Sequence, residues 1–206
     1  MKIGVLISGR GSNLEAILNA ISSGELNATI EVVISNNMHA PGLHVAREHG
    51  VPKILTLDAL AYASPQEYET HIIEELKSDG VQLLVLAGYM KIVGPTLLSA
   101  FKDHMMNIHP SLLPSFKGLN AQKQALEAGV KVSGCTVHFV TDDLDGGPII
   151  LQQAVLVSDD DTESSLSHRI LLSEQDIYKK AIQLYSEKRL VIDGQFVRIL
   201  PEGGMS

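Results

Sequence analysis

A histidine and an amide that could catalyse acyl transfer stand two residues apart in the segment Asn107-Ile108-His109-Pro110. The apolar run that leads into it predicts a strand over 104–110, and residues two apart on a strand point to the same side. Pro110 stops regular pairing, so both side chains are predicted at the strand's end. There the Asn107 amide could donate to a developing oxyanion, while His109 moves protons or stabilises charge.

A second candidate element is the acidic loop 141–148, with sequence TDDLDGGP. It is not a calcium loop, because the spacing of its acids is wrong and no glutamate follows at the required position. Two interpretations stay open. Its three aspartates can be solvated in a turn, or one can face inward to orient His109 and stabilise the charged imidazole.

The remaining histidines are interpreted as structural residues. His138 stands apart because its strand leads straight into the acidic loop. The full set is His39, His44, His49, His71, His104, His138 and His168.

A glycine turn, Gly9-Arg10-Gly11-Ser12-Asn13, joins the first predicted strand to the first helix. Glycines let backbone amides approach an anion, and a helix N-terminus adds partial positive charge. A dinucleotide fingerprint is weak because Leu14 replaces its third glycine, and no Gly-Lys-Ser/Thr is present for a nucleoside-triphosphate loop. A phosphate site and a capping box of Ser12 with Glu15 therefore remain as compatible alternatives.

These segments must be positioned by short apolar runs that alternate with amphipathic stretches. The predicted strands are 2–8, 29–35, 53–57, 82–88, 104–110, 133–140 and 149–157, and the predicted helices about 13–22, 41–49, 64–78 and 162–187. This alternation predicts an α/β fold: an open, mostly parallel twisted sheet with helices on both faces. Asp193-Gly194 predicts a C-terminal hairpin over 189–199. Ligands of such sheets gather at the carboxyl ends of the strands, where the three candidate segments fall.

Composition bounds the class of protein. The 206 residues are 45% hydrophobic and 19% charged, which suits one globular domain over 1–206. No apolar run approaches the roughly 18 residues of a membrane helix. Cys135 is the single cysteine, so neither an internal disulfide nor a thiolate metal cluster is expected. These features predict a cytoplasmic protein, and the net charge of −8 argues against nonspecific nucleic-acid binding.

Four segments together resemble one family: ISGRGSNL, LAGYMKIV, NIHPSLLPSFKG and VHFVTDDLDGGPII. In this order and spacing they resemble the folate-dependent phosphoribosylglycinamide formyltransferases over nearly the whole chain. The resemblance implies a Rossmann-like formyltransferase fold with a ribonucleotide half at about 1–100 and a folate-binding, catalytic half at about 101–206. It also implies 10-formyltetrahydrofolate as co-substrate, no metal and no NAD, small-molecule substrates, no nucleic-acid or membrane partner, and a monomer or weak homodimer.

The resemblance further assigns site residues. It implies a catalytic trio of Asn107, His109 and Asp145. Phosphate and ribonucleotide contacts map to Gly11, Ser12, Asn13 and Glu174. Folate contacts map to Met90, Lys91, Ile92, Val93, Asn107, Thr141, Asp142, Asp143, Leu144 and Asp145.

The activity expected from the resemblance is direct formyl transfer to the amine of glycinamide ribonucleotide, in purine (IMP) biosynthesis. A formyltetrahydrofolate hydrolase or another folate-dependent formyltransferase is the enzyme alternative. A nucleotide-binding regulatory module would need only the glycine turn, and it would leave the Asn107, His109 and Asp145 arrangement unexplained.

Overall fold

The computed structural model describes residues 1–203, and the chain divides into two compact units, Met1–Asn107 and Ile108 onward. Strand β5 (Met105–His109) ends the first unit and begins the second. The predicted domain runs to Ser206, and its last three residues lie outside the described residues.

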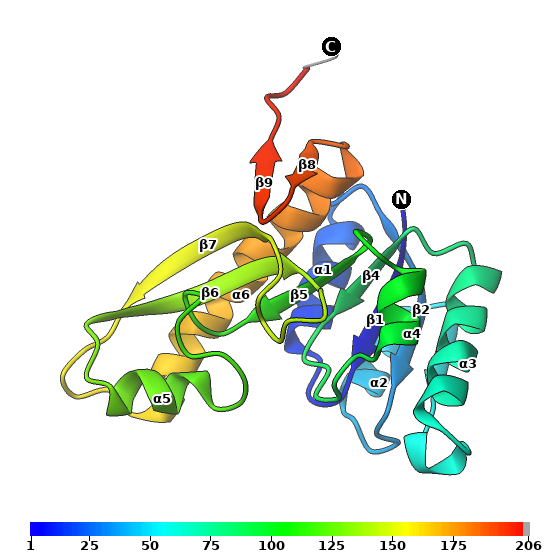
Figure 1. Cartoon of the computed structure of the whole chain (residues 1–206), viewed down its shortest axis with the longest axis horizontal. Coiled ribbons are helices and arrows are strands. Elements are labelled where there is room, and N and C mark those ends of the chain that lie inside the picture. Colours follow the sequence, from blue (N-terminus) through cyan, green and yellow to red (C-terminus); the bar gives the residue numbers. More distant parts are fainter. Residues whose placement is uncertain (204–206) are drawn as a thin grey trace. The chain divides into compact units, whose positions relative to one another are not determined.

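The first unit carries a parallel sheet (Figure 1). Its strands, with β5, are β1 (Lys2–Ile7), β2 (Thr29–Ser35), β3 (Lys53–Thr56) and β4 (Leu83–Leu86). They lie in the order β3-β2-β1-β4-β5, and every pair is parallel. The chain moves outward from β1 in one direction and from β4 in the other. The carboxyl ends of β1 and β4 therefore form a topological switch point, where open α/β sheets bind ligands.

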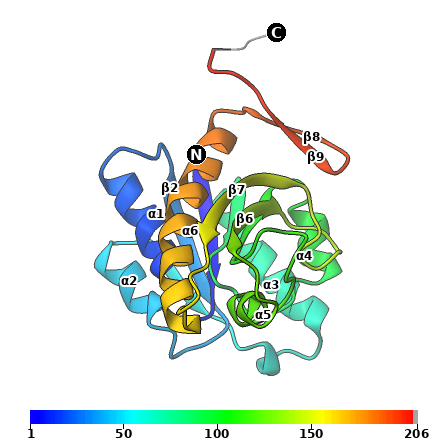
Figure 2. The ribbon, with the colours of Figure 1, turned by 90° about the vertical axis from the view of Figure 1, so that its left-hand side faces the viewer.

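Helices cover both faces of this sheet, as Figure 2 shows. α1 and α2 pack together on one face, and α3 and α4 pack together on the other. Their bounds are α1 (Ser12–Ser22), α2 (Gly42–Glu48), α3 (Pro65–Ser78) and α4 (Pro95–Ala100), with a 3₁₀ turn at Ala59–Ala61. All four residues of β4 are buried, as expected for a strand covered on both sides.

The second unit is built on an antiparallel pair, β6 (Val132–Phe139) and β7 (Ile149–Leu156). The long helix α6 (Glu163–Ser186) packs along both strands, and α5 (Ala121–Glu127) packs against α6. The predicted C-terminal hairpin is confirmed: β8 (Leu190–Asp193) and β9 (Phe196–Ile199) pair antiparallel around Gly194, whose φ is 61°. The predicted α/β class with mostly parallel pairing is likewise confirmed.

Helix starts show where local sequence signals hold and where they fail. The predicted start of α3 is confirmed, since Ser64 Oγ accepts the Glu67 N–H at 3.1 Å. The capping box of Ser12 with Glu15 is wrong: the residue that precedes α1 is Gly11, which makes no side-chain cap. Gly11 has a φ of 82°, a left-handed conformation that glycine adopts without strain and serine does not. The residue before the helix is therefore the glycine, and Ser12 is the first residue of α1.

Two helices, α4 and α5, were not predicted because six or seven residues carry little periodicity. Gly94-Pro95 at the start of α4 was the available signal, as proline favours the first turn. Within residues 1–203, no helix is long and apolar enough to span a membrane.

Candidate active site

His109, the last residue of β5, is held between two acceptors in the second unit. Its ring is almost fully buried, with Nε2 2.8 Å from the Phe116 carbonyl oxygen and Nδ1 3.4 Å from Asp145 Oδ2. A neutral imidazole has one N–H and can donate to only one of these groups, whereas an imidazolium can donate to both. Both ring nitrogens of His109 therefore face an oxygen that can accept a hydrogen bond.

Asp145 reaches His109 from the acidic loop. Its φ is 50°, a left-handed conformation that aspartate tolerates better than most residues. Its side chain is 9% exposed, and Oδ2 also accepts the Gly118 N–H at 2.8 Å. Of the two interpretations of this loop, the inward-facing aspartate is the observed one, and Asp145 is that residue.

His138 lies on the other side of Asp145, with Nε2 3.8 Å from Oδ1. Burial holds the pKa of His138 below its ordinary value of 6.5, and its Nδ1 lies 2.9 Å from the Phe139 carbonyl oxygen. A neutral ring that donates its one N–H from Nδ1 to the Phe139 carbonyl has no N–H for Asp145. His138 therefore does not compete with His109 for the Asp145 carboxylate. The structure thus adds His138 to the surroundings of the pair, as a residue that the sequence placed only near the acidic loop.

The segment 110–118 supplies the Phe116 carbonyl, and β6 and β7 fix its course. The buried Thr136 hydroxyl donates to the Ser111 carbonyl at 2.7 Å and accepts the Leu113 N–H at 3.0 Å. Gln152 donates to the Leu113 carbonyl and to the Thr136 hydroxyl, both at 2.9 Å. These bonds hold the loop that orients His109, and no motif identified Phe116, Thr136 or Gln152 beforehand.

The acidic loop itself is fixed at its end by close backbone approach. A Cβ on Gly147 would collide with the Phe139 carbonyl oxygen, and one on Gly146 would collide with the Asp143 side chain. Asp143 faces outward instead and pairs with Lys117 Nζ at 3.2 Å, while Leu144 is 57% exposed. The loop thus presents one buried carboxylate and an exposed apolar side chain.

Asn107 stands two residues before His109 on β5 and is half-buried. By strand geometry the two side chains project from the same face of the strand. β5 thus carries both residues, as the sequence predicted, while the described contacts of His109 are made by Phe116 and Asp145.

The glycine turn after β1 depends on close backbone contact with the start of α2. The Gly42 N–H donates to the Gly9 carbonyl at 3.1 Å. A Cβ on Gly11 would lie 2.6 Å from the Gly42 Cα. Gly11 is therefore needed for both its left-handed φ and its close approach, and the turn keeps Ser12 and Asn13 at the N-terminus of α1.

The segment after β4 lies at the same switch point. Met90 and Ile92 are 70% and 79% exposed, an unusual state for large apolar side chains in this unit. Lys91 Nζ lies 5.5 Å from the centre of the Tyr68 ring, a cation–π contact. The segment 90–93, which includes Val93, therefore offers apolar surface beside a cation at the edge of the sheet formed by the strands' carboxyl ends.

Glu174 and Cys135 lie in the second unit between α6 and β6. Glu174 is 8% exposed, and its charge acts on the fully buried thiol. Burial, with a further contribution from Glu174, raises the pKa of Cys135 to about 12. The thiol is therefore protonated and inert at neutral pH, as expected of a cysteine within a strand.

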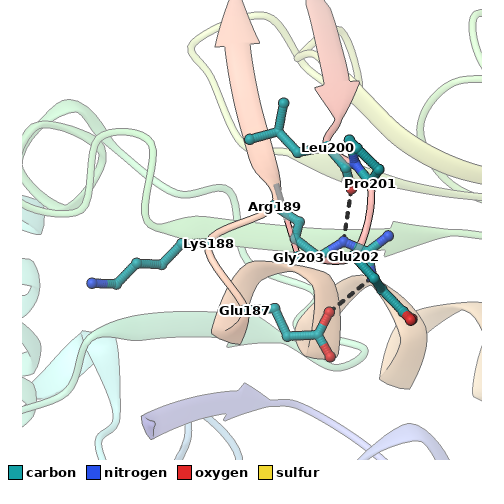
Figure 3. A pocket seen from close by; sticks show the side chains of 7 residues that line it. All are labelled: Glu187, Lys188, Arg189, Leu200, Pro201, Glu202 and Gly203. Atoms are coloured by element: carbon teal, nitrogen blue, oxygen red, sulfur yellow. Dashed lines mark hydrogen bonds and ion pairs between the residues drawn. The ribbon is translucent and has the colours of Figure 1, made fainter. Parts of the chain in front are cut away.

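A pocket of about 280 Å³ lies where α6 meets the C-terminal segment (Figure 3). Its residues are Glu187, Lys188, Arg189, Leu200, Pro201, Glu202 and Gly203. Arg189 pairs with Glu187 at 2.9 Å and Glu202 at 3.6 Å, and its Nε donates to the Leu200 carbonyl. Its cation is neutralised by these partners, and the pocket contains no predicted site residue.

The first unit of this α/β fold carries a switch point after β1 and β4, where such sheets bind ligands. The second unit carries the His109–Asp145 pair, which can move protons in a group transfer. Residues 1–182 match the formyl transferase family. The chain belongs to this family, which confirms the resemblance found in its motifs.

Individual relatives agree with this assignment. The chain is 41% identical over 210 residues to the phosphoribosylglycinamide formyltransferase of Escherichia coli (strain K12), covering 98% of each chain. It is 44% identical to the human trifunctional purine biosynthetic protein adenosine-3, covering 89% of this chain and 18% of that protein. Among solved structures, glycinamide ribonucleotide transformylase 1 from Symbiobacterium toebii superposes with a TM-score of 0.95 at 52% identity, covering 98% of this chain and 94% of that one.

Proposed function

We propose that the protein transfers the formyl group of 10-formyltetrahydrofolate to the amine of 5-phosphoribosylglycinamide, in de novo purine biosynthesis. The products are formylglycinamide ribonucleotide and tetrahydrofolate. The observation that carries the proposal is the buried His109–Asp145 pair at the end of β5, in a chain that belongs to the formyl transferase family. Relatives named phosphoribosylglycinamide formyltransferase cover nearly the whole chain and support this choice of acceptor.

The reaction is an acyl transfer without a covalent enzyme intermediate. The substrate amine forms a bond to the formyl carbon, and the carbonyl electrons move to oxygen to give a tetrahedral oxyanion. The bond from this carbon to N10 of the folate then breaks. N10 gains a proton and the former amine loses one, so atoms and charge balance.

In this proposal Asn107 and His109 stabilise the oxyanion, and His109 delivers a proton toward N10. Asp145 keeps His109 oriented, and its carboxylate lies beside the ring that carries the proton in this step. His109 Nε2 is bonded to the Phe116 carbonyl in this structure, so a ring proton reaches the substrate only when that bond is exchanged.

The proposed phosphate contacts follow the switch-point geometry of the first unit. Backbone amides at the N-terminus of α1 would hold the phosphate, with Gly11, Ser12 and Asn13 as the contact residues. Glu174 is the further ribonucleotide contact. The folate would contact residues 90–93 and 141–145, whose exposed Met90, Ile92 and Leu144 suit a flat heterocycle.

The hydrolase alternative is not favoured, because relatives covering nearly the whole chain are named as transferases. The proposal includes a cytoplasmic location and action on small molecules as a monomer or weak dimer. A net charge of −8 agrees with the absence of a nucleic-acid partner, because phosphates repel an acidic protein.

The test is steady-state tetrahydrofolate release from 10-formyltetrahydrofolate, with and without glycinamide ribonucleotide, for the wild type, His109→Ala and His44→Ala. His44 is a matched control, since it is exposed and pairs with Glu48 on the same helix, α2. Release that requires the amine, is lost in His109→Ala and persists in His44→Ala is expected. Tetrahydrofolate release without the amine would show a hydrolase. No tetrahydrofolate release either with or without glycinamide ribonucleotide would refute the proposal.

A further inference from the structure

Ser8 occupies the switch point of the first unit, directly after β1 and before the glycine turn. Its backbone is fixed on two sides: its N–H donates to the Gly88 carbonyl at 3.1 Å, and its carbonyl accepts from Asn37 Nδ2 at 3.3 Å. The residue is thereby fixed to the segments that follow β4 and β2. The backbone of Ser8 is therefore held in place, and its hydroxyl can in turn hold the groups that it contacts.

The Ser8 hydroxyl makes two directed hydrogen bonds. It donates to Asn36 Oδ1 at 2.6 Å and accepts the Met90 N–H at 2.8 Å. The donation to Asn36 orients the hydroxyl so that its lone pairs are available to Met90. One oxygen atom thus connects the segments after β1, β2 and β4 at the edge where the sheet binds ligands.

The rest of segment 88–97 is anchored from α3. The Tyr89 hydroxyl lies 3.0 Å from that of Tyr68, and burial raises the pKa of both phenols, so they stay neutral partners. The buried Glu69 carboxylate accepts the Gly94 N–H and the Leu97 N–H, the latter at 3.1 Å. These contacts fix the segment beside and beyond residues 90–93.

Within residues 90–93, the described hydrogen bond to the rest of the unit is that of Met90 to Ser8. The exposed side chains of Met90 and Ile92 have little packing to hold the backbone there. The course of the backbone therefore depends on a hydroxyl that belongs to the glycine-turn side of the switch point.

We propose that Ser8 is a positioning residue that holds the folate-contacting segment 90–93 in place beside the glycine turn. The inference rests on the proposed function for its substrate and gives a role to Ser8, a residue of the ISGRGSNL segment to which the resemblance assigned none. Loss of the hydroxyl frees the Met90 amide, so residues 90–93 sample more conformations and bind the folate less well. The fold is little affected, because the Met90 amide lies at an exposed residue and can bond to water.

The test compares Ser8→Ala and Ser8→Thr with Ser64→Ala. Ser64→Ala is the matched control, because Ser64 Oγ also accepts a backbone N–H, that of Glu67 at the start of α3, whereas Ser8 Oγ accepts that of Met90. Ser8→Thr keeps a hydroxyl. Hydrogen exchange of the Met90 amide in the substrate-free protein and steady-state kinetics with both substrates are the readouts.

Ser8→Ala is expected to speed exchange of the Met90 amide about tenfold and to raise KM for 10-formyltetrahydrofolate about fivefold, the effect of losing one net hydrogen bond. We expect kcat and KM for glycinamide ribonucleotide to stay within about twofold, as the turn itself is unaltered. Ser8→Thr should restore both readouts, and Ser64→Ala should leave them at wild-type values.

If the wild type transfers the formyl group but Ser8→Ala shows the same amide exchange and KM as Ser64→Ala, the role of Ser8 is overturned and the proposed function stands. A wild type that transfers no formyl group would overturn the proposed function and the folate role together. The exchange measurement needs no substrate, so it tests the Ser8–Met90 bond in either case.

Discussion

At the residue scale, the chemistry depends on how one carboxylate is shared. Asp145 Oδ2 faces His109 and accepts the Gly118 N–H, while Oδ1 faces the neutral His138. All three ionisable side chains are buried, so their interactions are little screened by solvent. The proposed mechanism therefore depends on the negative charge of Asp145, and not only on the hydrogen bonds that its oxygens accept.

Asp145→Asn tests the charge alone, because asparagine keeps an oxygen that can accept the Gly118 N–H. Turnover should fall roughly a hundredfold, since His109 loses the partner that stabilises its charged form, while the fold stays intact. Asp159→Asn is the control, as Asp159 is exposed and pairs with the exposed Lys131. Near-normal turnover of Asp145→Asn would remove this residue from the mechanism.

The lowered pKa of His138 predicts an acid sensitivity of the fold. Below about pH 6.5 the unfolded chain protonates this ring while the folded ring stays neutral, so unfolding takes up a proton. Stability from this residue is therefore present above pH 6.5 and is lost as the pH falls below it.

His138→Gln removes that titration. In urea unfolding, the variant should lose about 1 kcal/mol less stability than the wild type between about pH 7.5 and about pH 5.5. An identical pH dependence in the two proteins would contradict a buried neutral His138.

At the element scale, two loops depend on specific contacts. One has no space for an added side chain, and the other requires a buried hydroxyl as a hydrogen-bond partner. The glycine turn needs Gly11 against Gly42, and segment 110–118 needs the Thr136 hydroxyl. Both loops follow a strand end, where regular pairing no longer fixes the backbone.

Gly11→Ala measures the close approach when it is compared with Gly24→Ala. Both glycines have φ near +80°, but a Cβ at Gly24 would meet nothing within 4 Å. The shared φ costs an alanine about 1 kcal/mol. The contact with Gly42 should cost Gly11→Ala about 2 kcal/mol more in free energy of unfolding and raise KM for the ribonucleotide. Equal losses in the two variants would show that the turn has room for a side chain.

Thr136→Val preserves shape and removes the buried hydroxyl that bonds Ser111, Leu113 and Gln152. The stranded partners should cost about 2 kcal/mol of stability, and kcat should fall because the Phe116 carbonyl no longer holds His109 firmly. Thr29→Val, at the exposed first residue of β2, should change stability by less than about 0.5 kcal/mol. If Thr136→Val is as active as Thr29→Val, the course of segment 110–118 does not affect catalysis.

At the scale of the whole molecule, strand and helix order followed from patterning, because buried parallel strands read as apolar runs and α3 and α6 carry clear caps. The inward turn of Asp145 could not be derived that way. It depends on a left-handed φ and on the close approach of Gly147 to the Phe139 carbonyl, which exists only once β6 is placed. The Ser8 hydroxyl bonds join residues more than 25 positions apart, and no local motif encodes them.

The central claim is that the formyl carbon passes directly from folate to the ribonucleotide amine. The most direct measurement follows an isotopically labelled formyl group by mass spectrometry in a mixture of enzyme, 10-formyltetrahydrofolate and glycinamide ribonucleotide. The account predicts the label in formylglycinamide ribonucleotide, in an amount equal to the tetrahydrofolate released. Label recovered as free formate, with the ribonucleotide unchanged, would contradict it.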